Sequence, residues 1–82
     1  MEVKLYTTDY CSYCVAAKRL LDQLSIPFQE VRLDNDPETR ERLSRENNGY
    51  RTVPMIFIDD KFIGGYTELA ALHRNNQLKK PN

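Results

Sequence analysis

The most constraining feature of this sequence is an apolar run in its second half, residues 53–58 (VPMIFI), which no polar residue interrupts. A strand with one face in water alternates between apolar and polar residues, whereas a strand covered on both faces is apolar throughout. Residues 54–58 are therefore predicted to form a central strand. The run is much shorter than the roughly 20 apolar residues that a membrane-spanning helix needs. We thus expect a sheet that carries helices on both of its faces.

The rest of the chain alternates between strand-like and helix-like patterns. Strands are predicted at residues 3–7, 28–33, 54–58 and 61–63, and helices at residues 12–24, 37–47 and 68–76. Asp36 before Pro37 predicts the start of the second helix, and Thr67 is the predicted N-cap of the third. The order β-α-β-α-β-β-α predicts an α/β fold, with a four-stranded mixed sheet flanked by three helices.

Length and composition limit the classes of function. The chain has 82 residues, which suits a single domain over residues 1–82. Twelve basic residues balance twelve acidic ones, so the basic excess that is typical of a nucleic-acid-binding protein is missing. Residues 1–4 do not resemble the start of a secretory signal peptide. We therefore expect a cytoplasmic monomer without nucleic-acid or membrane partners.

The chain has two cysteines, Cys11 and Cys14, where the first predicted strand passes into the first predicted helix. The unpaired N–H groups and the dipole at a helix N-terminus stabilise a thiolate, and the thiolate is the nucleophilic form of cysteine. Cys14 falls in the first helical turn, close enough to attack a mixed disulfide on Cys11. This spacing predicts Cys11 as the nucleophile and Cys14 as the resolving thiol.

Other interpretations of the cysteine pair are weaker. A structural zinc site needs four ligands, and His73 is the one histidine in the sequence. A disulfide that closes so short a loop would constrain the unfolded chain little. Two unrelated core cysteines remain an alternative. The close spacing of the two cysteines, together with the reducing compartment that we expect, favours redox chemistry.

Three segments together resemble the glutaredoxins of the thioredoxin-like superfamily. They are residues 5–7 before the motif at 11–14 (CSYC), residues 51–54 (RTVP) and residues 64–69 (GGYTEL). The resemblance covers nearly the whole chain and implies a thioredoxin-like fold. It also implies a glutathione-dependent thiol–disulfide oxidoreductase that uses Cys11 and Cys14. Its partners would be glutathione, as cosubstrate, and proteins that carry disulfides or bound glutathione.

The resemblance implies a glutathione groove beside the cysteine motif. Pro54 would be the cis-proline of the family, which would turn the Val53 backbone toward the ligand. The N-terminus of the last helix would hold the γ-glutamyl group, with Thr67 at its carboxylate and Glu68 at its amino group. Without the resemblance, Pro54 would be interpreted as the start of a strand and Thr67 as an ordinary cap. The implied glutathione-binding residues are Tyr13, Arg51, Thr52, Val53, Pro54, Gly65, Tyr66, Thr67 and Glu68.

Four residues leave alternatives open. Arg51, or Arg40 from the second helix, would attract the glycyl carboxylate, although such arginines are more often surface charges. Thr8 stands where many relatives carry a lysine, so fewer cations surround Cys11. Ser12 stands where many dithiol relatives carry proline; relatives with serine there sometimes hold a glutathione-ligated [2Fe–2S] cluster, which we do not expect here.

If the glutathione-dependent oxidoreductase is counted as the first candidate function, the second is a glutaredoxin-like electron donor for ribonucleotide reductase that thioredoxin reductase recharges. Such proteins share the length and the Cys-x-x-Cys spacing. They resemble this chain less at residues 52–54 and 64–66. A [2Fe–2S] cluster carrier is the third alternative.

Overall fold

The computed structural model describes residues 1–78, so the end of the predicted domain at residue 82 lies outside the described residues. The elements in chain order are β1 (Val3–Thr7), α1 (Ser12–Gln23), β2 (Gln29–Arg32), α2 (Pro37–Glu46), β3 (Met55–Ile58), β4 (Lys61–Gly64) and α3 (Tyr66–Arg74). The predicted order of strands and helices is confirmed, and most boundaries agree within one or two residues. No helix in this part of the chain is both long and apolar enough to cross a membrane.

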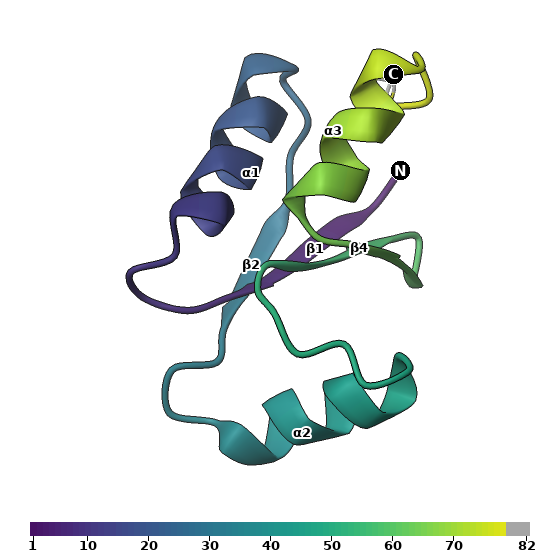
Figure 1. Ribbon diagram of the computed structural model, residues 1–82. Coiled ribbons are helices and arrows are strands. Elements are labelled where there is room, and N and C mark those ends of the chain that lie inside the picture. Colours follow the sequence, from purple (N-terminus) through teal and green to yellow (C-terminus); the bar gives the residue numbers. More distant parts are fainter. Residues whose placement is uncertain (79–82) are drawn as a thin grey trace.

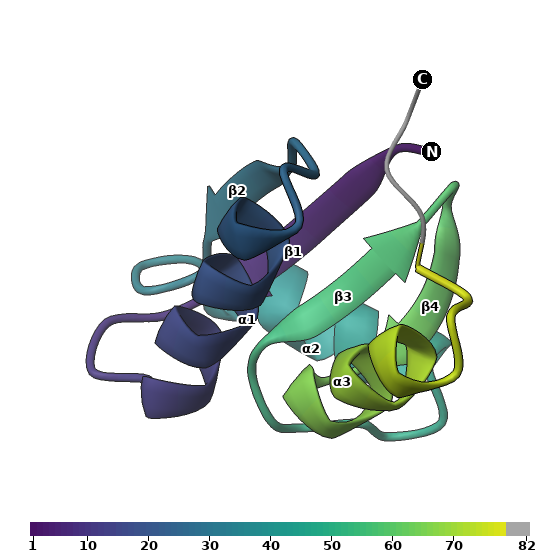
Figure 2. The same cartoon turned by 90° about the horizontal axis from the view of Figure 1, so that it is seen from above.

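The four strands form one mixed sheet in the order β2-β1-β3-β4. β1 is parallel to β2 and antiparallel to β3, and β3 and β4 form an antiparallel hairpin. Helices α1 and α3 cover one face of the sheet, and α2 covers the other (Figures 1 and 2). The prediction of a central strand after residue 53 is confirmed, because β3 lies between β1 and β4.

The uninterrupted apolar character of β3 has a direct structural reason. Met55 and Ile56 are neighbours, so their side chains point to opposite faces of the sheet, and both are fully buried. Ile56 belongs to the core beneath α1 and α3, together with Leu5 and Leu69. Met55 packs with Leu43 of α2 on the other face. Each face of the sheet therefore has its own apolar core.

Two of the three helix starts agree with the sequence prediction. Cys11 is the N-cap of α1, and Asp36 is the N-cap of α2, where its carboxylate accepts a hydrogen bond from the Thr39 N–H at 3.1 Å. Both caps are short polar side chains directly before a helical pattern. Cys11 is thus held at the positive end of α1, as the sequence indicated.

The prediction that Thr67 caps the last helix is wrong. Helix α3 begins at Tyr66, its N-cap is Gly65, and the Thr67 side chain is exposed within the first turn. The reason is a competing contact, because the Glu68 carboxylate reaches back and accepts a hydrogen bond from the Gly65 N–H at 2.7 Å. Gly64 allows this approach: it has φ +117°, and a Cβ there would lie 2.5 Å from Glu68 Oε1.

Candidate active site

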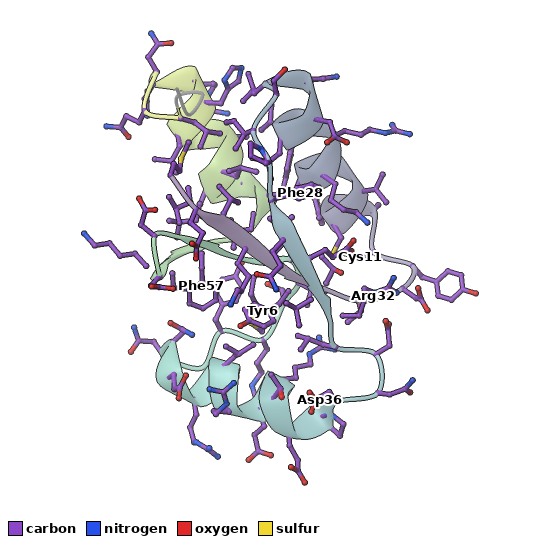
Figure 3. All side chains as sticks on the ribbon, turned by 180° about the vertical axis from the view of Figure 1, so that it is seen from behind. Tyr6, Cys11, Phe28, Arg32, Asp36 and Phe57 are labelled. Atoms are coloured by element: carbon purple, nitrogen blue, oxygen red, sulfur yellow. The ribbon has the colours of Figure 1, made fainter. Side chains whose placement is uncertain are left out.

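The two cysteines lie at the junction between β1 and α1. Cys11 is half-buried, and its Sγ accepts a hydrogen bond from the Cys14 N–H at 3.0 Å. That N–H is one of the groups that a helix leaves without an internal partner in its first turn. The positive end of the α1 dipole therefore points at the Cys11 sulfur. Figure 3 shows Cys11 at the edge of the molecule, near Arg32 of β2.

Cys14 has a different environment, although it is one helical turn away. It is 2% exposed and, like Ala17 and Leu21, belongs to the buried side of α1. Burial raises the pKa of the Cys14 thiol from 9.0 to about 12, and its hydrogen bond with Cys11 acts in the same direction. Both cysteines are free thiols in this structure. At neutral pH Cys14 is therefore a protonated thiol beneath a half-exposed Cys11.

The Val53–Pro54 segment, directly before β3, lies beside the cysteines because β3 is the antiparallel neighbour of β1. The peptide bond between these residues is cis, as the resemblance implied. The thiol of Cys11 lies 3.5 Å from the Val53 carbonyl oxygen, to which it donates a hydrogen bond. The backbone of residue 53 is thus held directly beside the sulfur, although it is far away along the chain.

A cavity of about 230 Å³ adjoins this contact. Its lining is Tyr13, Tyr50, Thr52, Val53, Pro54, Gly65, Tyr66, Thr67 and Glu68. The rings of Tyr13 and Tyr66 stack across it, with centroids 6.2 Å apart. Gly65 is needed for space, because a Cβ there would lie 2.6 Å from the Tyr50 hydroxyl. The fold therefore brings eight of the nine expected groove residues to one cavity.

Arg51 is the expected residue that this cavity does not include. It lines a separate, larger hollow of about 820 Å³ against α2, together with Arg40. Arg40 donates a hydrogen bond from Nη2 to the Arg51 carbonyl oxygen at 3.1 Å. The two candidate partners of a glycyl carboxylate are thus neighbours, but they lie in an adjoining depression.

Tyr50 is a cavity residue that the sequence analysis did not single out. Its ring packs edge-on against Phe62, with centroids 4.9 Å apart, so it resembles an ordinary core aromatic. The available signal was its place directly before the segment 51–54 that carries the resemblance. Among residues 1–78, no three His, Cys, Asp or Glu side chains are grouped in a way that would hold a metal ion.

Comparison with known proteins agrees with this geometry. The glutaredoxin family model matches residues 3–63. A glutaredoxin of Pseudomonas aeruginosa is 43% identical over 76 residues, which cover 93% of this chain and 89% of that protein. A probable glutaredoxin of Synechocystis is 41% identical over 77 residues, covering 94% and 88%.

Solved structures give the same result. A buckwheat glutaredoxin in complex with glutathione superimposes with a TM-score of 0.86 at 34% identity, covering 93% of this chain and 71% of that one. A wheat glutaredoxin has a TM-score of 0.85 at 35% identity, covering 94% and 74%. With a matching family model, similar relatives and this fold, the chain belongs to the glutaredoxins, a family of thiol–disulfide oxidoreductases with a thioredoxin-like fold.

Proposed function

We propose that this glutaredoxin reduces glutathione mixed disulfides and protein disulfides with electrons from glutathione. Cys11 is the nucleophile and Cys14 the resolving thiol. The observation that carries the proposal is the contact between Cys11 Sγ and the Val53 carbonyl at 3.5 Å, next to the cavity that the expected groove residues line. The proposed nucleophile therefore lies next to the backbone edge to which a peptide would bind.

The chemistry follows from the positions of the two sulfurs. The Cys11 thiolate attacks the glutathione sulfur of a mixed disulfide, and the substrate leaves as a thiolate that takes up a proton. A second glutathione then attacks the Cys11-bound glutathione and releases oxidised glutathione. When the substrate is a protein disulfide, Cys14 attacks Cys11 and releases the substrate protein. The first route needs Cys11 alone, whereas the second needs both cysteines.

The cavity offers matching groups for glutathione. The backbone of Val53 can pair with the extended tripeptide as an added strand would. The N–H groups of Tyr66 and Thr67 are at the start of α3 and suit the γ-glutamyl carboxylate. Glu68 already accepts from Gly65, so its second carboxylate oxygen is the one left for the ligand's amino group. The glutathione complex of the buckwheat relative supports this choice of ligand.

A coupled assay tests the proposal. The substrate is a mixed disulfide of glutathione with a small thiol, and NADPH oxidation is followed with glutathione plus glutathione reductase, or with thioredoxin reductase alone. We expect turnover in the first system only. Turnover that depends on thioredoxin reductase would overturn the proposal and favour an electron donor of the other kind. A brown, dimeric protein on purification would favour the cluster carrier.

A further inference from the structure

The dithiol route poses a problem that the cysteines alone do not solve. Cys14 has to attack as a thiolate, yet it is 2% exposed, and in the reduced protein burial together with its hydrogen bond to Cys11 raises its pKa to about 12. Little of it is ionised near neutral pH. A group that stabilises negative charge on this buried sulfur would accelerate the resolving step. The surroundings of Cys14 contain such a group.

Both cysteines border a third hollow, of about 510 Å³, which shares no lining residue with the 230 Å³ cavity beside Val53. It contains two cations, Lys18 and Arg32. Arg32 forms an ion pair with Asp34 at 2.7 Å and another with Asp9, so its charge is compensated by two carboxylates. Lys18 has one carboxylate partner, Glu30, and its charge acts on the Cys14 thiol, so it is the cation to consider. The charged and titratable groups around this hollow are Asp9, Tyr10, Cys11, Cys14, Lys18, Glu30, Arg32 and Asp34.

The position of Lys18 is fixed by its place in α1 and by its contact with Glu30. It follows Cys14 by four residues in α1, which puts the two side chains on one face of the helix. Its Nζ lies 3.0 Å from Glu30 Oε2. The same carboxylate oxygen accepts a hydrogen bond from Thr7 Oγ1 at 2.6 Å, and Thr7 is 1% exposed in β1. Glu30 and Thr7 thus link Lys18 to the strands β2 and β1 beneath α1, the helix that carries Cys14.

Glu30 serves as an anchor and not as a proton acceptor. The hydrogen bond from Thr7, followed by the contact with Lys18, lowers the pKa of the Glu30 carboxyl below its ordinary value despite its partial burial. It is therefore a carboxylate at neutral pH and a weak base. For Cys14, burial is the dominant influence; a backbone hydrogen bond with Thr8 and, to a smaller extent, the Lys18 charge oppose it and lower the pKa of the thiol.

We propose that Lys18, positioned by Glu30 and Thr7, stabilises the Cys14 thiolate when it resolves the mixed disulfide. The inference rests on the proposed function. The Cys14 thiolate attacks Cys11 Sγ, a bond forms between the two protein sulfurs, and the bond from Cys11 to the substrate sulfur breaks. The electron pair leaves with the substrate sulfur, which takes a proton from solvent, and the proton of Cys14 passes to solvent. The protein dithiol is oxidised by two electrons and the substrate is reduced.

A quenched single-turnover experiment isolates this step. Reduced protein is mixed with the symmetrical disulfide of a short cysteine peptide, stopped with acid at set times, and analysed by mass spectrometry. This separates the Cys11–peptide mixed disulfide from the internal Cys11–Cys14 disulfide. The variants are Lys18→Met, Lys18→Arg and, as a matched control, Arg19→Met at an exposed neighbouring position of α1. Each is measured at several pH values between pH 6 and 9.

We expect Lys18→Met to slow conversion of the mixed disulfide into the internal disulfide by the same factor at every pH between 6 and 9, because this range lies well below the pKa of Cys14. For each unit by which the loss of Lys18 raises the pKa of Cys14, the thiolate fraction falls about tenfold. A more basic thiolate is also a better nucleophile, which returns roughly threefold, so the net loss at pH 7 is about threefold. Lys18→Arg should keep most of the rate, and Arg19→Met should match the wild type.

Two outcomes would overturn the inference. One is an unchanged conversion rate in Lys18→Met across this pH range. The other is an equal loss in formation of the mixed disulfide, which would mean that Lys18 acts on Cys11 or on folding. Turnover of a small glutathione mixed disulfide in the Cys14→Ser protein, with and without Lys18→Met, should be the same. If that turnover is absent altogether, the proposed function fails and not the role of Lys18.

Discussion

The sulfur of Cys11 lies 3.5 Å from the backbone carbonyl oxygen of Val53, which is 42 positions further along the chain. The contact joins the N-terminus of α1 to the cis peptide bond before β3. It places a nucleophilic sulfur beside a backbone edge that can pair with a peptide ligand. The proposed thiol chemistry and the proposed recognition of glutathione therefore depend on a single junction, and variants can separate them.

Selective alkylation tests the difference between the two thiols. Brief treatment of the reduced protein with iodoacetamide near pH 7 should label Cys11 and leave Cys14 unlabelled. Cys11 is half-buried at a helix N-terminus, whereas Cys14 is buried and its pKa is raised to about 12. Mass spectrometry of the digested protein gives the site. Preferential labelling of Cys14 would reverse the assignment of roles.

The pKa of Cys14 also predicts how stability depends on pH. Folding raises this pKa from 9.0 to about 12, so above pH 9 the unfolded chain loses the proton while the folded protein keeps it. The free energy of unfolding should fall as pH rises between these values, by at most about 1.4 kcal/mol per pH unit. Denaturant unfolding at several pH values measures the slope. The Cys14→Ala protein is the control, and an equally steep slope in that variant would contradict the prediction.

The cap of α3 gives a stability prediction that distinguishes two neighbouring residues. Glu68→Ala should lower the free energy of unfolding by about 1 kcal/mol, because the Gly65 N–H loses its side-chain partner. Thr67→Ala should change it by no more than about 0.5 kcal/mol, because Thr67 is exposed and does not cap the helix. Thermal melts compare the two. A larger loss in Thr67→Ala would restore Thr67 as the cap.

Because Thr67 does not cap α3, its substitution becomes a clean test of a ligand contact. Thr67→Ala should weaken the apparent affinity for glutathione about ten- to hundredfold, because a hydrogen bond to a charged carboxylate contributes about 1.5–3 kcal/mol. Thr67→Ser, which keeps the hydroxyl, should retain the affinity. The measurement is the glutathione concentration dependence of turnover. Unchanged dependence in Thr67→Ala would move the carboxylate site to other groups of the cavity.

Local patterns in the sequence were enough for most of the fold. The apolar run at residues 53–58 predicted a strand covered on both faces. Neighbouring side chains of a strand point to opposite faces, so the run itself shows that both faces of β3 need cover. The caps Cys11 and Asp36 were also predicted, because a cap is defined by residues within one helical turn. The start of α3 was missed, since Thr67 and Glu68 both match cap patterns and the chosen one depends on how Gly64 turns the chain.

The parts of the site that the sequence did not predict depend on contacts between distant segments. Tyr50 reaches the cavity because of the path of the chain from α2 to β3, which its residue type does not encode. Arg51 lies in the adjoining hollow because the direction of a long side chain is set by its neighbours. The contact of Lys18 with Glu30 joins α1 to β2, and no local pattern marks the pair.

The most direct test of the central claim is the rate of glutathione mixed-disulfide reduction by the Cys11→Ser and Cys14→Ser proteins, measured side by side with glutathione and glutathione reductase. The account predicts that Cys14→Ser stays active, because a second glutathione can attack the Cys11-bound glutathione. It predicts that Cys11→Ser is inactive, because the attacking sulfur is gone. If Cys14→Ser proves as inactive as Cys11→Ser, the glutathione mechanism proposed for this site is wrong.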